Sequence, residues 1–235
     1  MAGRWCTLVT LFQNPANMTE HPVKLSRRGK IATITLNRPA RHNALVPELL
    51  SGLLRSIEHD DCQSAAAVIL RAEGRSFSTG GDLLGFKHHS DNIGDYSRKL
   101  VGQLNRVILA IYAHPAPIVC AVHGQVTGGS LGLLLAADWV IMHREVTITP
   151  YYVAVGFSPD GGWTALLPDI IGRQQTMDWL ASNASYDAET CLSLGLVHQV
   201  VENDCDAAAL AWAERVAEMQ SASIAGATSC SVCIS

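Results

Sequence analysis

The sequence is poor in charged and aromatic residues, and it contains no long apolar run. Of its 235 residues, 16% are charged and 6% aromatic, whereas 48% are hydrophobic. A chain this apolar is not disordered as a whole. Its longest apolar stretch, around residues 131–137, contains Gly132 and is followed by Asp138, so it is too short to span a bilayer. We therefore expect a soluble, folded protein with no membrane partner.

Basic clusters, a cysteine framework and a targeting signal are also missing. The net charge is −4 and Lys and Arg are scattered, which argues against a nucleic-acid partner. The seven cysteines form no framework, and Cys230 and Cys233 have no second pair to complete a zinc site. His88 and His89 are neighbours without a third ligand. We expect reduced thiols, no metal and a cytoplasmic protein.

The residue pattern divides the chain into four segments. Residues 1–17 are expected to be a poorly ordered N-terminal extension, residues 18–172 an α/β core, residues 173–220 a helical C-terminal part, and residues 221–235 an atypical tail. In the core, the pattern predicts strands at 31–36, 67–71, 118–122, 140–142 and 147–149, and helices at 47–59, 95–112 and 131–137. After Pro159 it predicts helices at 161–171, 174–182, 187–194 and 206–219. Apolar strands alternating with helices indicate a parallel sheet covered by helices.

Two glycine turns each follow a predicted strand and precede a helix. The first contains Gly80 and Gly81, and the second contains Gly128 and Gly129. Glycine allows a ligand to approach the backbone, and the first amides of a helix lack intrahelical partners. Two facing turns could therefore donate two N–H groups to one oxygen, which stabilises an oxyanion by about 3–4 kcal/mol per donor. Alternatively, each turn only reverses the chain. Neither fits a phosphate-loop or dinucleotide pattern.

Several motifs in one order, from about Met18 to Met219, resemble the crotonase, or enoyl-CoA hydratase/isomerase, superfamily. They are Asn37-Arg38-Pro39 with Asn43-Ala44-Leu45, Phe77-Ser78-Thr79-Gly80-Gly81-Asp82, Pro117 to Gly124, Gly128-Gly129, Ala136-Ala137-Asp138, Gly156 to Gly162, and Ala188 to Val197. This resemblance implies a crotonase-like α/β fold, a spiral of stacked ββα turns followed by a helical part. It also implies a homotrimer or a dimer of trimers.

The resemblance further implies a coenzyme A thioester as substrate. The backbone amides of Gly81 and Gly129 would hold the thioester carbonyl as it becomes an enolate. Substrate- and CoA-binding positions would be Arg41, His42, Ala44, Ser78, Gly80, Asp82, Leu83 and Tyr152. No separate cofactor is implied, because coenzyme A is part of the substrate.

The sequence departs from the hydratases of this superfamily at both catalytic glutamates. Gly132 and Tyr152 occupy the corresponding positions. Glycine cannot transfer a proton, and a phenol with a reference pKa near 10 is a poor base at neutral pH. Family members also usually continue for two further helices, which residues 221–235 do not resemble. Ordinary hydratase chemistry is therefore not expected.

Asp160 offers a different acid, at a position where isomerases of the superfamily carry a catalytic aspartate. One carboxylate suffices to move a proton between two carbons, so the resemblance favours conversion of a 3-enoyl-CoA to a 2-enoyl-CoA. The alternative is structural, because Ser158, Pro159 and Asp160 also form an ordinary helix start. Hydratase, hydrolase or dehalogenase-type chemistry, or binding of acyl-CoA without catalysis, are the other hypotheses.

Overall fold

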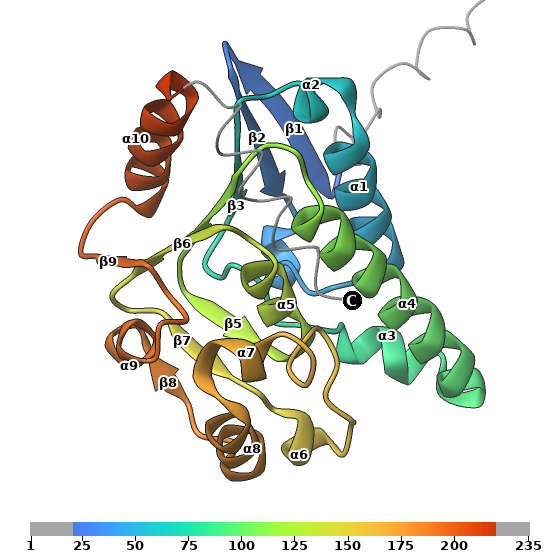
Figure 1. Cartoon of the computed structure of the whole chain (residues 1–235). Helices are drawn as coiled ribbons and strands as arrows, with labels where there is room; N and C mark the ends of the chain where they lie inside the picture. The colour runs from blue at the N-terminus through green and yellow to red at the C-terminus, as the bar shows by residue number, and fades with distance from the viewer. Residues whose placement is uncertain (1–20, 220–235) are drawn as a thin grey trace, which may run out of the picture.

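A computed structural model describes residues 21–219, and a six-stranded sheet forms its centre (Figure 1). The strands, in sheet order, are β1 (Val23–Arg28), β2 (Ile31–Leu36), β3 (Ala67–Ala72), β4 (Ile118–Val122), β6 (Trp139–His143) and β9 (Gln199–Val201). The first two strands pair antiparallel and the others parallel. This confirms the parallel α/β core, although the edge strands β1 and β9 were not predicted.

A second row of strands lies beside the first and positions the glycine turns. It contains β5 (Gln125–Thr127), β7 (Thr147–Thr149) and β8 (Tyr186–Asp187). Isolated bridges from Leu45 to Gly81 and from Ser78 to Val126 extend this row. Along the chain, a strand of the six-stranded sheet is thus followed repeatedly by a short strand or bridge of the second row. This is the predicted stacked ββα spiral.

The main sheet is apolar on both faces because helices cover both. The helices are η1 (Pro39–Arg41), α1 (Pro47–Glu58), α2 (Asp60–Gln63), α3 (Leu83–His88), η2 (Ser90–Asn92), α4 (Ile93–Tyr112), η3 (Gly128–Ser130), α5 (Leu131–Leu135), α6 (Tyr152–Val155), α7 (Leu167–Ile171), α8 (Arg173–Ser182), α9 (Ala188–Ser193) and α10 (Cys205–Glu218). On one face, α1 and α4 pack against each other (Figure 1). On the other, Trp212 of α10 belongs to a cluster with Ile69 and Val119. Alternate residues of the central strands therefore point to opposite faces of the sheet and pack into two separate hydrophobic cores.

One predicted helix begins later than expected, and this changes the setting of Asp160. The pattern predicts a helix over 161–171, but α7 begins at Leu167. Gly161 and Gly162 have φ of +57° and +81°, which is the left-handed region and does not continue a right-handed helix. Asp160 therefore lies on an irregular segment, and the prediction of an ordinary helix start there is wrong.

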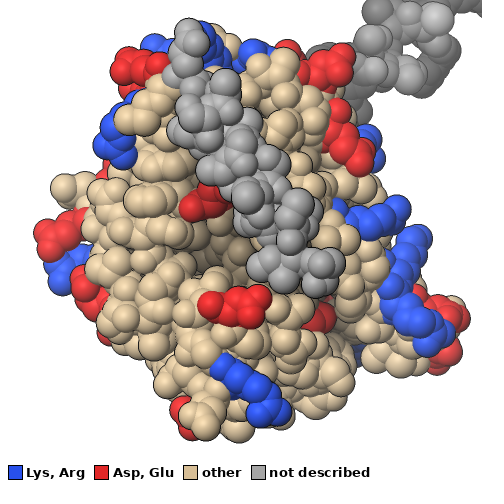
Figure 2. Space-filling view, viewed as in Figure 1, with Lys and Arg blue, Asp and Glu red and all other residues tan. Residues whose placement is uncertain are grey.

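The surface of the described residues carries charged side chains of both signs. On the face drawn in Figure 2, most Lys and Arg side chains of the described residues lie near the edge, with several along the right side, and acidic side chains lie among them. No helix within residues 21–219 is long and apolar enough to cross a membrane. The predicted extension, residues 1–17, and the predicted tail, residues 221–235, lie outside the described residues.

Candidate active site

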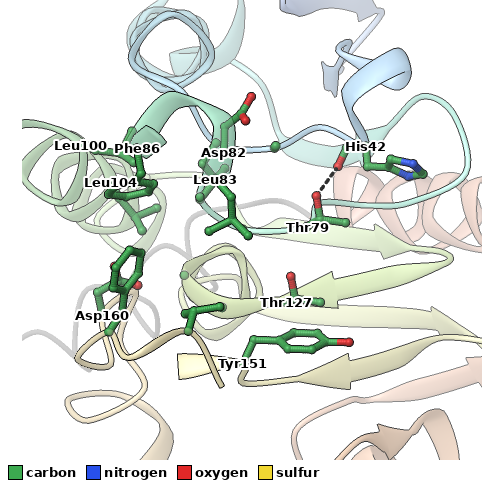
Figure 3. A pocket seen from close by; sticks show the side chains of 18 of the residues that line it. His42, Thr79, Asp82, Leu83, Phe86, Leu100, Leu104, Thr127, Tyr151 and Asp160 are labelled. Atoms are coloured by element: carbon green, nitrogen blue, oxygen red, sulfur yellow. Dashed lines mark hydrogen bonds between the residues drawn. The ribbon is translucent and has the colours of Figure 1, made fainter. Parts of the chain in front are cut away.

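A cavity of about 570 Å³ lies where the two glycine turns meet. Figure 3 shows that Phe86, Leu100 and Leu104 gather at one end of it with Asp160, while His42 and Thr79 lie at the opposite end. All the site residues predicted from the sequence line this cavity except Ser78: Arg41, His42, Ala44, Gly80, Gly81, Asp82, Leu83, Gly129, Tyr152 and Asp160. The fold thus brings together groups that are far apart in the sequence.

Ser78 is fully buried and does not line this cavity, and its role in binding CoA stays a prediction. Its hydroxyl donates to the Asn43 carbonyl over 2.8 Å, and its own carbonyl accepts from the Ser130 hydroxyl at 3.0 Å. Its N–H and C=O also pair with Gln125 and Thr127 in the adjacent segment. Ser78 therefore joins the two glycine turns to each other.

The backbone of the two turns directs one N–H group from each away from the protein scaffold. The Gly80 carbonyl accepts from the Leu45 N–H at 2.7 Å, and the Gly128 carbonyl accepts from the Trp163 indole at 2.8 Å. In a trans peptide, the carbonyl and the following N–H point in opposite directions. The N–H groups of Gly81 and Gly129 therefore point away from Leu45 and Trp163, and both glycines line the cavity. This arrangement fits a pair of donors to one oxygen.

Asp82 is held by two arginines at the edge of the cavity. Its carboxylate oxygens lie 3.2 Å from Arg38 and 3.0 Å from Arg41, and one of them also caps α3 by accepting from the Leu84 N–H. Burial alone would raise the pKa of the Asp82 carboxyl group, but the hydrogen bond from Arg38 and the positive charges of both arginines outweigh it and lower this pKa. Asp82 is thus a fixed anion, unsuited to accept a proton near neutral pH.

We expect Asp82→Asn to destabilise the protein by about 2 kcal/mol at pH 7, because charge-assisted hydrogen bonds are lost. A carboxyl group whose pKa is lower in the folded than in the unfolded state stabilises the fold at pH values above its unfolded pKa. This stabilisation is lost as the pH falls through its folded pKa. The difference in free energy of unfolding between Asp82→Asn and the parent should therefore become smaller below pH 3.8, the ordinary aspartate pKa. Urea unfolding at pH 7 and below pH 4 measures this. Exposed Asp178 provides the control Asp178→Asn, and equal effects of both substitutions would contradict the account.

Asp160 is the second carboxylate of the cavity, and its surroundings differ from those of Asp82. The Tyr152 hydroxyl donates to Oδ1 of Asp160 at 2.6 Å and lies 3.2 Å from its main-chain carbonyl. A Cβ on Gly129 would lie only 2.6 Å from the same Oδ1, so the carboxyl group lies directly beside the second glycine turn. Burial raises the pKa of Asp160, and the hydrogen bond from Tyr152 offsets only part of this rise.

Sequence reasoning missed several side chains that line the cavity or support its backbone. Leu100 and Leu104 were expected only as part of a helix, yet they form its apolar end. Trp163 was not singled out, although it is fully buried and anchors the Gly128 carbonyl. No local pattern could have indicated this contact, because Trp163 and Gly128 are 35 residues apart in the sequence.

The similarity to known proteins agrees with this geometry. The model of the enoyl-CoA hydratase/isomerase family matches residues 26–231. The chain belongs to this family. The 4-chlorobenzoyl coenzyme A dehalogenase-2 of an Arthrobacter species is 30% identical over 77% of this chain and 67% of the relative. The 1,2-epoxyphenylacetyl-CoA isomerase of Escherichia coli K12 is 31% identical over 74% of this chain and 67% of the relative.

Solved structures of the enoyl-CoA hydratase/isomerase family share the fold. The enoyl-CoA hydratase of Bacillus halodurans superposes with a TM-score of 0.81 and 29% identity, over 88% of this chain and 84% of that one. The fold predicted from the sequence is therefore confirmed. The relatives include proteins named as hydratase, isomerase and dehalogenase, so membership establishes an acyl-CoA enzyme family and does not by itself fix the reaction.

The position of the first family glutamate has no room for a side chain here. A Cβ on Gly132 would lie 2.4 Å from the Gly161 carbonyl oxygen and 2.5 Å from Ile108. A Cβ on Gly161 would in turn lie 2.4 Å from the Gly129 carbonyl oxygen. These close backbone contacts seat the Asp160 segment against the second glycine turn. The position of the second glutamate holds Tyr152, whose hydroxyl bonds to Asp160.

Proposed function

We propose that this member of the family isomerises the double bond of an enoyl-CoA, from the 3-enoyl to the 2-enoyl thioester. The observation that carries the proposal is the position of Asp160. It is a half-buried carboxyl group that lies beside Gly129 and at the apolar end of the cavity. Its partner is a phenol and not a cation. A base placed between an oxyanion donor and an acyl chain suits proton transfer between carbons.

In this proposal, the N–H groups of Gly81 and Gly129 bind the thioester oxygen. Asp160 removes a proton from C2, and the electron pair of the broken C–H bond enters a dienolate that the two N–H groups stabilise. The protonated carboxyl group then returns the proton to C4, and the double bond comes to lie between C2 and C3. No atom is gained or lost, and Asp160 ends in its starting form.

The electrostatics of Asp160 support this role. Burial raises its pKa, which makes the carboxylate a stronger base than a solvated aspartate. Each oxyanion donor is expected to stabilise the dienolate by about 3–4 kcal/mol. The apolar side chains of Phe86, Leu100 and Leu104 exclude water from the same end of the cavity and so strengthen both interactions.

The polar end of the cavity is proposed to hold the coenzyme. Arg41 and His42 lie at this end, on the segment that bonds to the first glycine turn through Leu45. Arg41 is partly exposed while it pairs with Asp82, so its guanidinium has free N–H groups for a phosphate. Ala44, Gly80 and Leu83 would contact the chain that leads to the thioester.

Addition of water is not supported by these residues. Hydration would need a second group to activate water beside Asp160, but Gly132 offers no side chain and the Tyr152 hydroxyl already donates to Asp160. Burial and the nearby charge of Asp160 also raise the pKa of Tyr152, so the phenol is no base. We therefore expect isomerisation without hydration.

A paired assay of the purified protein tests this proposal. Conversion of trans-3-hexenoyl-CoA to its conjugated isomer is followed by absorbance, and crotonyl-CoA is followed for loss of its conjugated absorbance. We expect the first reaction to exceed the second by at least about 10³-fold, the scale of a general acid–base contribution. Hydration at a comparable rate would overturn the proposal. Binding of both thioesters with no turnover would indicate a non-catalytic binder instead.

A second use of Asp160 is favoured by the relation to a dehalogenase. The carboxylate could attack the chlorine-bearing ring carbon of a 4-chlorobenzoyl thioester, so that a C–O bond forms, the C–Cl bond breaks and chloride leaves; water would then hydrolyse the resulting aryl ester and regenerate the carboxylate. Intact-protein mass spectrometry during turnover of 4-chlorobenzoyl-CoA distinguishes the two uses. An acyl or aryl adduct that is absent in Asp160→Asn would favour nucleophilic chemistry, whereas an unmodified mass would favour proton transfer.

A further inference from the structure

The Tyr152 hydroxyl is hydrogen-bonded to the carboxyl group of Asp160. The hydroxyl oxygen is 2.6 Å from Oδ1 and 3.2 Å from the main-chain oxygen of the same residue. The side chain is buried, with 5% of its surface exposed, so water does not compete for this bond. An O–H···O distance of 2.6 Å is typical of a charge-assisted hydrogen bond. The phenol and the carboxyl group therefore act as one unit.

The ring of Tyr152 is fixed in place from the other side. It meets the fully buried Trp163 edge to face, with ring centroids 6.0 Å apart and an interplanar angle of 86°. Trp163 in turn donates to the Gly128 carbonyl, which belongs to the peptide that carries the Gly129 N–H. One pair of aromatic rings thus contacts both the carboxyl group and the peptide of the second glycine turn.

The two oxygens of Asp160 are not equivalent in this setting. Oδ1 lies between the Tyr152 hydroxyl and the backbone of Gly129, where a single Cβ would lie 2.6 Å away. We propose that Tyr152 is a positioning residue, which occupies Oδ1 and leaves Oδ2 as the atom of Asp160 that exchanges protons with substrate. This inference rests on the proposed isomerase function. The C2–H bond breaks as Oδ2–H forms, and Oδ2–H breaks as C4–H forms, while the phenol keeps its own proton.

The same hydrogen bond adjusts the basicity of Asp160. A donor binds an ionised carboxylate more strongly than a protonated one, so Tyr152 opposes the effect of burial on the pKa of Asp160. Oδ1 lies beside the backbone of Gly129 in η3, and the carboxyl group also receives a hydrogen bond from the Asp160 backbone. Among the groups that shift the pKa of Asp160, Tyr152 of α6 is the titratable one. Burial and the Asp160 charge raise the pKa of Tyr152, so it stays a donor across the working pH range.

Tyr152→Phe removes the hydroxyl and keeps the ring against Trp163. We expect kcat for trans-3-hexenoyl-CoA to fall by about 10- to 100-fold, because the carboxyl group loses the contact that orients it and a small misplacement of a reacting group lowers the rate on this scale. KM should change by less than about threefold, because the phenol acts on Asp160 and not on the thioester. Without this donor the pKa of Asp160 rises, so the acid limb of kcat/KM should move up by about one pH unit.

Tyr186→Phe is the matched control. Tyr186 is also a tyrosine packed against a buried tryptophan, stacked on Trp179 with ring centroids 4.1 Å apart, but its hydroxyl accepts from Gln175, whereas the Tyr152 hydroxyl donates to Asp160. This control should leave the acid limb where it is. A Tyr152→Phe profile that coincides with the parent profile would overturn the proposal, even if kcat fell through loss of stability.

A carboxyl titration separates this inference from the proposed function. The ¹³C signal of Asp160, assigned by its loss in Asp160→Asn, is followed against pH in the parent and in Tyr152→Phe. A higher carboxyl pKa in the variant supports the positioning contact. If the parent then showed no isomerase activity, the proposed function would fail and the contact would stand. Identical titrations in the two proteins would refute the positioning role whatever the activity.

Discussion

Asp160→Asn is expected to lower kcat for isomerisation by about 10³-fold, the middle of the range for a general acid–base group. Asparagine keeps the shape of the side chain and an oxygen that accepts from Tyr152, but it cannot take a proton from C2. The N–H groups of Gly81 and Gly129 remain, so binding of the thioester should change little. Steady-state kinetics on trans-3-hexenoyl-CoA give kcat, and calorimetric titration with a saturated acyl-CoA gives affinity.

The parallel substitution Asp82→Asn provides the comparison for this effect. Asp82 is the other carboxylate of the cavity, but its arginine partners keep its pKa low, so it holds no proton to return to the substrate. Its loss should act on stability and on coenzyme affinity more than on kcat. Full activity of Asp160→Asn, or an equal loss of kcat in both variants, would refute the assignment of the base.

The second large effect is expected at Gly132. Gly132→Ala places a Cβ 2.4 Å from the Gly161 carbonyl oxygen, a backbone atom that cannot move aside like a flexible side chain. We expect the free energy of unfolding to fall by about 3 kcal/mol or more, together with loss of isomerase activity as the Asp160 segment is displaced. Gly132→Glu should behave alike and gain no hydratase activity. Urea unfolding and the paired assay measure both outcomes.

Gly102 supplies the matched control, because it lies in α4 with open space around its Cβ position. Gly102→Ala should stabilise the helix by up to about 1 kcal/mol and leave the assay unchanged. A well-folded Gly132→Glu variant that hydrates crotonyl-CoA would show that the glycine contact is not what excludes water chemistry.

The main sheet could be predicted because its strands carry the pattern of burial on both faces. Ile118–Val122 is a continuous apolar run and Ile31–Leu36 is a β-branched segment with period-2 alternation, and the structure gives both as buried strands with the predicted bounds. The edge strand Val23–Arg28 was missed because it is mostly exposed and carries several charges. The short strand Gln125–Thr127 was read as part of the glycine turn, since three residues are too few to show a period.

The candidate site could be predicted in its backbone elements and not in its side-chain partners. Glycine turns after strands are local features, so a pair of N–H donors could be predicted from the two turns, and the resemblance to the family assigned these donors to Gly81 and Gly129. The bond from Tyr152 to Asp160 could not, because it depends on the left-handed backbone of Gly161 and on the close packing at Gly132. Likewise, Arg38 and Asp82 meet across 44 residues, which no local pattern records.

The most direct test of single-carboxylate chemistry is the mass and structure of the product formed from trans-3-hexenoyl-CoA. Asp160 would take one proton from C2 and deliver one proton to C4. The account therefore predicts a product of unchanged mass with its double bond at C2. That product should accumulate without further conversion. A product that has gained the mass of one water would contradict the account, because it would require a water-activating group where Gly132 and Tyr152 now lie.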